Sequence, residues 1–141
     1  MVDPRIDIDT QIFDNSETRI KLCQMTGGHF RDLMLLMQSA MRQVDDFPIN
    51  RKAVNRAISD ARDGTYRNAV NYEEWDKLAK VYRSKNIDHN EEYRSLLFRR
   101  CVLEYRDFNT EGNPVRWYDI HPLIEGTSEF QSALNRLISN E

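Results

Sequence analysis

One stretch of the sequence, from Met25 to Leu33, combines residues that suit the recognition of an anionic partner. Gly27 and Gly28 end one predicted helix, and Arg31 falls in the first turn of the next. An arginine is a permanent cation with several N–H donors, but in a first helical turn the macrodipole disfavours it. This position indicates that Arg31 serves a partner. The alternative is a glycine helix stop followed by an exposed arginine.

Other residue types that carry chemistry are scattered along the chain. No glycine-rich stretch has the GxxxxGK[ST] spacing that surrounds a phosphate with backbone N–H groups, so we expect no nucleotide site within this chain alone. The three histidines lack the spacing that places two imidazoles on one helical face. No G-x-S-x-G elbow is present, and neither cysteine has a histidine at a suggestive position. The sequence predicts no metal site and no complete active site.

The cysteines and the apolar runs bear on the location of the protein. Cys23 and Cys101 each lie in an apolar segment without a second metal ligand, and we expect both to be buried thiols in a reducing compartment. No stretch reaches the roughly 20 apolar residues of a membrane helix. The acidic N-terminus, broken by Pro4, is unlike a secretion signal. We therefore expect a cytoplasmic protein without a membrane partner.

Length and charge limit the functions further. A chain of 141 residues with 40% apolar content fits one domain, or two small units sharing a core. The net charge of −3 gives the whole chain no attraction to nucleic acid or anionic lipid. One predicted helix face is basic, and Arg51, Lys52 and Arg56 are our candidate nucleic-acid contacts. Acids lie among them, and a solvated face of mixed charge is the commoner interpretation.

Helical spacing of apolar residues governs the first two thirds of the chain. A short helix is expected to end at Gly27-Gly28. Three more helices are expected, from Asn50 to about Asp63, from Asn71 to Tyr82 and from Asn90 to Arg100. Between these, the clearest helix carries one apolar stripe that we expect to face the core, formed by Phe30, Leu33, Met34, Met37, Met41 and Val44 and widened by Leu36 and Ala40.

The apolar period changes from 3.6 to 2 at Cys101. Strands over 101–106 and 115–121, joined by a turn-forming segment and stopped by Pro122, predict a β-hairpin followed by a last helix. Three helices and then a hairpin is the order of a winged helix. We therefore expect a mainly α fold with a helical region in front, a winged-helix-like unit with one β-hairpin, and a C-terminal helix.

The hairpin contains large aromatic side chains that invite a functional interpretation. Trp117 and Tyr118 are suited to base stacking, but large aromatics on a hairpin more often pack on the helices beneath, and we expect this of Trp117. His121 before Pro122 is expected to be structural. The helix from Asn90 begins with two glutamates where a DNA reader presents cations or amides, which argues against sequence-specific DNA binding.

The stretch Thr26-Gly27-Gly28-His29-Phe30-Arg31-Asp32-Leu33 resembles the lid segment of AAA+-type P-loop ATPases of the origin-recognition and bacterial conflict-system groups. In those families a small-Gly-Gly-x-x-Arg-x-Leu pattern opens a lid helix. The resemblance extends from about Ile12 to Ile124, with the less specific residues Val102-Leu103-Glu104-Tyr105, Trp117 and His121-Pro122-Leu123. The P-loop core, the Walker acids and any arginine finger lie outside the matching segment.

The resemblance implies a regulatory C-terminal region of an ATPase. Residues 1–46 would be the lid and residues 47–141 a winged-helix-like tail. Arg31 would be the sensor 2 residue, contacting the terminal phosphates of ATP that the core binds with Mg²⁺, and Gly27 and Gly28 would allow the sharp turn beside it. The partners would be the N-terminal P-loop core of the same polypeptide and neighbouring subunits, with no cofactor held by this chain itself.

Two further hypotheses follow from the residues. In the first, the chain is a freestanding winged-helix nucleic-acid binder that uses Arg51, Lys52, Arg56 and the hairpin. Alternatively, it is a structural adaptor that binds another protein through the apolar surface of its methionine-rich second helix.

Overall fold

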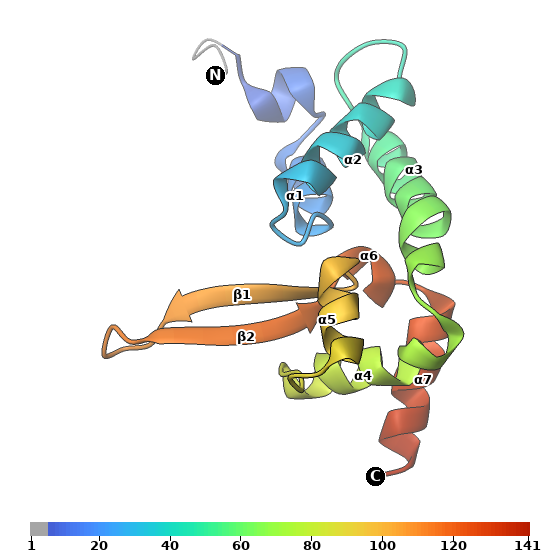
Figure 1. Cartoon of the computed structure of the whole chain (residues 1–141). Coiled ribbons are helices and arrows are strands. Elements are labelled where there is room, and N and C mark those ends of the chain that lie inside the picture. The colour runs from blue at the N-terminus through green and yellow to red at the C-terminus, as the bar shows by residue number, and fades with distance from the viewer. Residues whose placement is uncertain (1–5) are drawn as a thin grey trace. The chain divides into compact units, whose positions relative to one another are not determined.

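The computed structural model describes residues 6–141, which form two compact units, Met1–Asp63 and Gly64–Glu141. Helices dominate both units, and one antiparallel hairpin precedes the C-terminal helix (Figure 1). The predicted mainly α fold with one β-hairpin and a C-terminal helix is therefore confirmed. The division into a lid over 1–46 and a tail over 47–141 stays a prediction about function.

The first unit consists of three α-helices after a π-helical turn at Ile8–Ile12: α1 (Ser16–Gln24), α2 (Phe30–Arg42) and α3 (Arg51–Ala61). Asparagine side chains begin two of them. Asn15 accepts the N–H of Thr18 at 3.0 Å, and Asn50 accepts that of Ala53 at 2.9 Å. Each cap satisfies a backbone donor that has no partner within the helix.

The core of the first unit lies where the three helices pack on one another. Leu22 of α1, Leu36 of α2 and Val54 of α3 are almost completely buried. On α2 the inward face is formed by Asp32, Leu36 and Ala40. The predicted inward stripe is therefore partly wrong: Leu36 and Ala40, expected to widen it, are buried, whereas Phe30, Met34 and Met41 are exposed.

The second unit contains α4 (Trp75–Ser84), α5 (Glu91–Phe98), the short α6 (Pro122–Glu125) and α7 (Ser128–Ser139). Single 3₁₀ turns at Arg67–Ala69 and Tyr72–Glu74 precede α4. Helix α4 packs against α7 and against the hairpin. The apolar side chains of α4 fill this junction, where Leu78 and Ala79 are completely buried. Among residues 6–141, no helix is long and apolar enough to cross a membrane.

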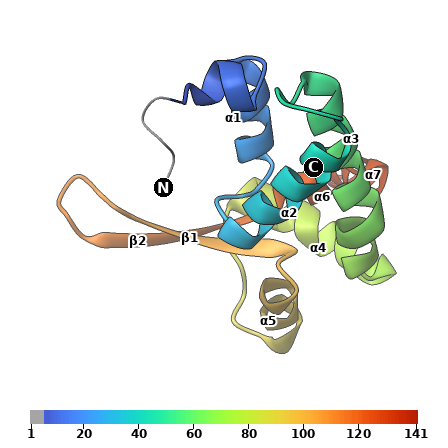
Figure 2. The ribbon, with the colours of Figure 1, turned by 90° about the horizontal axis from the view of Figure 1, so that it is seen from above.

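The hairpin joins β1 (Val102–Phe108) to β2 (Pro114–Ile120) in antiparallel register, with Tyr105 opposite Trp117. Two orthogonal views show it reaching beyond the helices of its own unit (Figures 1 and 2). Its base is tied to the end of α4 at Lys85, whose carbonyl oxygen accepts the N–H of Tyr118 at 2.9 Å. The ammonium of Lys85 also reaches Asp119 at 2.9 Å and lies over the ring of Tyr82.

Two expectations about side chains are wrong, and two hold. Cys23 is exposed, because α1 buries Thr18 and Leu22 instead, whereas Cys101 is buried as expected. Trp117 is not a core residue: it stacks on Tyr105, with 4.4 Å between ring centroids, and is 38% exposed. Its stacking partner comes from the facing strand β1 and not from a helix. His121 is buried and its Nδ1 accepts the N–H of Leu123, so it has the structural role that was expected.

Candidate functional site

The loop between α1 and α2 is built around its two glycines. Gly27 and Gly28 have φ angles of 65° and 82°, in the left-handed region that glycine enters without a steric penalty. Buried Thr26 holds the turn from both sides: its hydroxyl donates to the carbonyl of Cys23 at 2.7 Å and accepts the N–H of Gly28 at 3.1 Å. The loop therefore fixes the direction in which α2 begins.

Arg31 lies in the first turn of α2, directly after this loop. Its side chain is exposed and makes no hydrogen bond or ion pair with residues 6–141. The neighbouring Asp32 points the other way and is 2% exposed. A guanidinium at the N-terminal end of a helix gains nothing from the macrodipole, so the fold itself gives no electrostatic reason for it. Among the described residues, Arg31 is thus an unpaired cation at the start of α2.

An exposed apolar surface borders Arg31. Phe30, Met34 and Met41, here named the apolar strip, are 73, 43 and 44% exposed. Their spacing of four and seven residues places them on one face of α2, and Arg31 is the surface neighbour of Met34 three residues on. A cationic group beside large exposed apolar side chains is typical of a surface that another molecule covers. Helical spacing alone assigned the strip to the core.

The three candidate nucleic-acid contacts lie in the first half of α3. Arg51, Lys52 and Arg56 are exposed, and their side chains have no charged partner among the described residues. Arg51 and Lys52 occupy the first turn, where the helix macrodipole disfavours cations. They lie on a different helix from Gly27, Gly28 and Arg31. The structure therefore presents two separate sets of unpaired cations in the first unit.

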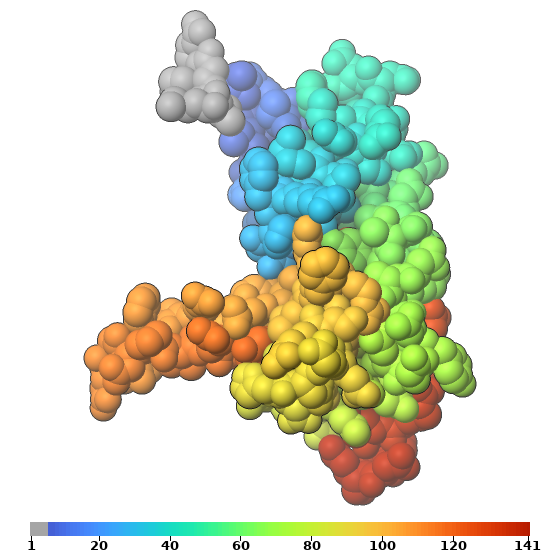
Figure 3. Space-filling model, viewed as in Figure 1, coloured from blue at the N-terminus to red at the C-terminus, as the bar shows by residue number. Residues whose placement is uncertain are grey.

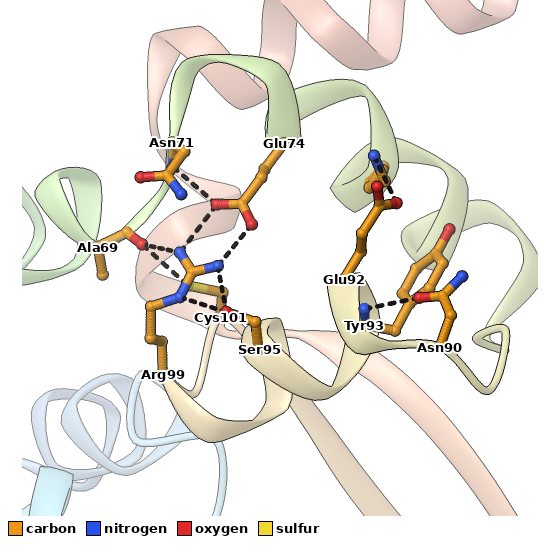
Figure 4. A network of polar contacts seen from close by, with 10 residues as sticks. Ala69, Asn71, Glu74, Asn90, Glu92, Tyr93, Ser95, Arg99 and Cys101 are labelled. Atoms are coloured by element: carbon orange, nitrogen blue, oxygen red, sulfur yellow. Dashed lines mark hydrogen bonds and ion pairs between the residues drawn. The ribbon is translucent and has the colours of Figure 1, made fainter.

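The second unit contains a polar network in which the charges are matched (Figure 4). Arg99, at the end of α5, donates to both carboxylate oxygens of Glu74 and to the carbonyl of Ala69. The other donor to Glu74 is the N–H of Asn71, at 2.8 Å, which completes a capping box before α4. Burial opposes ionisation of Glu74, but the hydrogen bonds from Arg99 and Asn71 outweigh it and lower its pKa.

Cys101 lies beside this network and is chemically quiet. Its thiol is completely buried and lies 3.6 Å from the carbonyl of Ala69. Burial raises the pKa of the thiol to about 11. A thiolate is the reactive form of cysteine, and this environment suppresses it. The network of Glu74, Arg99 and Cys101 therefore holds together the 3₁₀ turn before α4, the end of α5 and the start of β1, and it does not perform chemistry.

A cleft that was not predicted from the residue pattern lies between the start of α4 and the start of α7. It encloses about 690 Å³ and is lined by polar and aromatic residues, including Tyr72, Trp75, Glu129 and Arg136. Arg136 in this cleft is paired with Asp76 at 3.0 Å, and Glu129 is paired with Arg67 at 2.9 Å. These charges satisfy one another. In the described part of the chain, no group of three His, Cys, Asp or Glu residues is placed to hold a metal ion.

No protein-family model matches the chain, and no curated protein or solved structure matches it either.

Proposed function

We propose that this chain is the regulatory lid and tail of an AAA+-type ATPase, in which Arg31 senses nucleotide bound to a P-loop core. The observation that carries the proposal is the unpaired, exposed Arg31 at the start of α2, directly after two left-handed glycines. The proposed partners are the N-terminal P-loop core of the same polypeptide and neighbouring subunits. ATP and Mg²⁺ would be held by that core and not by this chain.

The chemistry of the helix start supports this function. The first backbone N–H groups of a helix and an arginine beside them both favour a negatively charged ligand. The guanidinium fork binds phosphate oxygens through charge-assisted hydrogen bonds. Hydrolysis removes the terminal phosphate, so an arginine that contacts it distinguishes ATP from ADP. The rigid loop at Thr26, Gly27 and Gly28 would keep this arginine in place while the lid moves.

The apolar strip supports closure against another domain. Phe30 and Met34 are large, exposed and adjacent to Arg31. If α2 closes on the nucleotide-binding core, Arg31 reaches the phosphates. Phe30 and Met34 then become buried at the rim of the contact. In this arrangement the hairpin and α7 form the tail that passes the motion to a partner.

The test is a comparison of two arginines on the same helix in the full-length protein that contains the P-loop core. Arg31→Ala should lower ATP affinity or turnover by about 10- to 100-fold, the effect of losing charge-assisted hydrogen bonds. Arg42→Ala is the matched control, because Arg42 ends α2 and donates to the carbonyl of Gln38 at 3.2 Å. Unchanged ATP affinity and turnover in Arg31→Ala would show that Arg31 is not a nucleotide sensor.

A second candidate function, a protein-binding adaptor, is favoured by the exposure of the apolar strip. Here Phe30, Met34 and Met41 would be anchor residues for a partner protein, with no nucleotide involved. The double variant Phe30→Ser/Met34→Ser should then lose a partner that the unchanged chain retains, while Arg31→Ala should keep it. Retention of the partner by the double variant would contradict this function.

The nucleic-acid alternative has weaker support. Arg51, Lys52 and Arg56 are exposed and unpaired, but the hairpin at 102–120 carries Glu104, Asp107, Glu111 and Asp119 against two arginines. A hairpin with this charge does not favour contact with phosphates. Duplex binding that weakens steeply with salt and is lost in Arg51→Ala/Lys52→Ala would be needed to support this alternative.

A further inference from the structure

The hairpin of the second unit is supported at one end only. Tyr118 and Ile120 are buried at its base, whereas Phe108, Val115 and Trp117 further out are 70, 41 and 38% exposed. In Figure 3 the outer half is an arm beyond the helices of its unit. A two-stranded hairpin is marginally stable in water unless a helix or a further strand supports it. The outer half of this hairpin has neither within its own unit.

The backbone of β1 presents hydrogen-bonding groups on its outer edge. Tyr118 donates its N–H to Lys85, so its backbone groups point away from β1. Pairs in an antiparallel ladder alternate, so Glu104, opposite Tyr118, and Arg106, opposite Arg116, direct their backbone groups away from β2. Within the described residues, no backbone hydrogen bond reaches them from outside the hairpin. Such an edge is a template for another strand.

The charges along this edge select one occupant and one register. Glu104 and Arg106 flank Tyr105 on β1. If two β1 strands pair antiparallel about a two-fold axis at Tyr105, Glu104 of each copy stands opposite Arg106 of the other. An axis at Glu104 or Arg106 would instead place like charges opposite each other, which destabilises a sheet. Of these three registers, only the one centred on Tyr105 places opposite charges across the edge.

The same register adds a contact to a charge cluster within each hairpin. Arg106 and Arg116 lie directly opposite each other and share one carboxylate, Glu104, at 3.3 and 3.5 Å. Glu104 also accepts the hydroxyl hydrogen of Tyr118 at 3.0 Å. In the dimer Arg106 faces Glu104 of the second copy in addition to its own, although the ratio of arginines to glutamates stays the same. This cross-strand contact is specific to a second copy of the chain, because an arbitrary peptide strand offers no carboxylate at that position.

The aromatic side chains favour the same arrangement on the other face. Tyr105 stacks on Trp117 with 21° between the ring planes. Pairing at Tyr105 places two such stacks side by side, so that four rings cover adjacent strands. Cross-strand aromatic pairs stabilise sheets beyond the burial of their area. The flank of Tyr105 that faces away from Trp117 thereby leaves water.

We propose that two copies of this chain associate through the outer edges of their β1 strands, paired antiparallel about Tyr105 into one four-stranded sheet. The proposal does not depend on nucleotide sensing, because it involves no residue of the first unit. The contact is short, so the dimer forms at high protein concentration or where another contact already brings two copies together.

Charge reversal tests the register in sedimentation experiments on the full chain over a range of concentrations. Glu104→Arg and Arg106→Glu should each weaken dimerisation about tenfold, because each replaces two attractive cross-strand pairs by repulsive ones. The double variant Glu104→Arg/Arg106→Glu should restore it. Arg94→Glu, at an exposed position of α5, is the control and should leave dimerisation unchanged. Circular dichroism checks that every variant is folded.

Disulfide trapping tests the axis directly. In a Cys23→Ser background, Tyr105→Cys should form a cross-linked dimer with oxygen and a copper catalyst, because residues on the axis face each other closely enough for a disulfide. Asp107→Cys is the matched control: it lies on the same side of the same strand, but its two copies are far apart in this register. A chain that stays monomeric, or one that dimerises without responding to these changes, overturns the proposal.

Discussion

Charged side chains are used differently in the two units, Met1–Asp63 and Gly64–Glu141. In the second unit, basic residues of α4 and α7 lie beside acids, as in Lys77–Glu92 and Arg136–Asp76, both at 3.0 Å. In the first unit Arg19 is paired with Asp9 at 2.6 Å, but Arg31, Arg51 and Lys52 are exposed without such partners in the described part of the chain. Exposed ion pairs contribute little to stability, so folding does not require this difference. The cations without partners are the ones on which the proposed nucleotide and nucleic-acid functions rest.

The comparison extends to the apolar side chains of helix α2, which has one buried and one exposed face. The largest change in stability is expected on its buried face. Leu36 is 1% exposed, so Leu36→Ala should lower the free energy of unfolding by about 3 kcal/mol through lost burial and a cavity. Phe30→Ala, on the apolar strip, should change it by less than about 0.5 kcal/mol. Urea unfolding followed by circular dichroism measures both. A large loss in Phe30→Ala would show that the strip is part of the core.

The matched charges of the second unit are tested at Glu74. Glu74→Gln should lower the free energy of unfolding by about 2 kcal/mol at neutral pH, since it leaves the partly buried Arg99 without its carboxylate. Folding lowers the pKa of Glu74, so its stabilisation is present at neutral pH and is lost as the pH falls through the pKa of the folded carboxyl. The difference in the free energy of unfolding between the wild type and Glu74→Gln should therefore become smaller in acid.

Tryptophan fluorescence measures this effect selectively, because Trp75 and Trp117 both belong to the second unit. Glu91→Gln is the control: Glu91 pairs with Arg94 at 2.9 Å, but both side chains are largely exposed, so its effect should be within about 0.5 kcal/mol. Equal losses in the two variants, or a gap that does not change with pH, would contradict the buried ion pair as the cause.

The smallest effect is expected at the glycine loop before α2. Gly28→Ala should cost about 1 kcal/mol, because φ is 82° while an added Cβ would have no heavy atom within 4 Å. Gly64→Ala is the control, since its Cβ would also meet open space but its φ lies outside the left-handed region. Unfolding curves by circular dichroism compare them. A cost in Gly64→Ala equal to that in Gly28→Ala would contradict backbone strain as the cause.

Local signals in the sequence predicted most of the elements. Asn50 and Asn90 act as helix caps, the alternation after Cys101 becomes β1, and Gly27 and Gly28 end the first helical segment. The exposure of α2 and of Trp117 was not predictable in the same way. Periodicity locates an apolar stripe, but which part of it is covered depends on α1 and α3, whose packing is not encoded in α2 itself.

The candidate site shows the same limit. The residue types and order around Arg31 were readable from the sequence, as were the cations of α3. That Arg31 is unpaired, while Arg99 is held by Glu74 and Ala69, depends on contacts between residues distant in sequence. The Glu74–Arg99 pair spans 25 positions, and no spacing rule connects them. The hairpin edge likewise becomes visible only when the strand register is known.

Lys85 couples the end of α4 to the second strand, and this has a consequence for amide exchange with solvent. Its own N–H closes the last turn of α4 on the carbonyl of Val81 at 2.7 Å, and its carbonyl receives the N–H of Tyr118. The amide of Tyr118 therefore cannot exchange until the end of α4 opens with the base of β2. The amide of Arg116, two residues along the same edge, meets no such carbonyl within the described residues. Exchange rates at these two neighbouring positions should record where the cooperatively folded part of the hairpin ends.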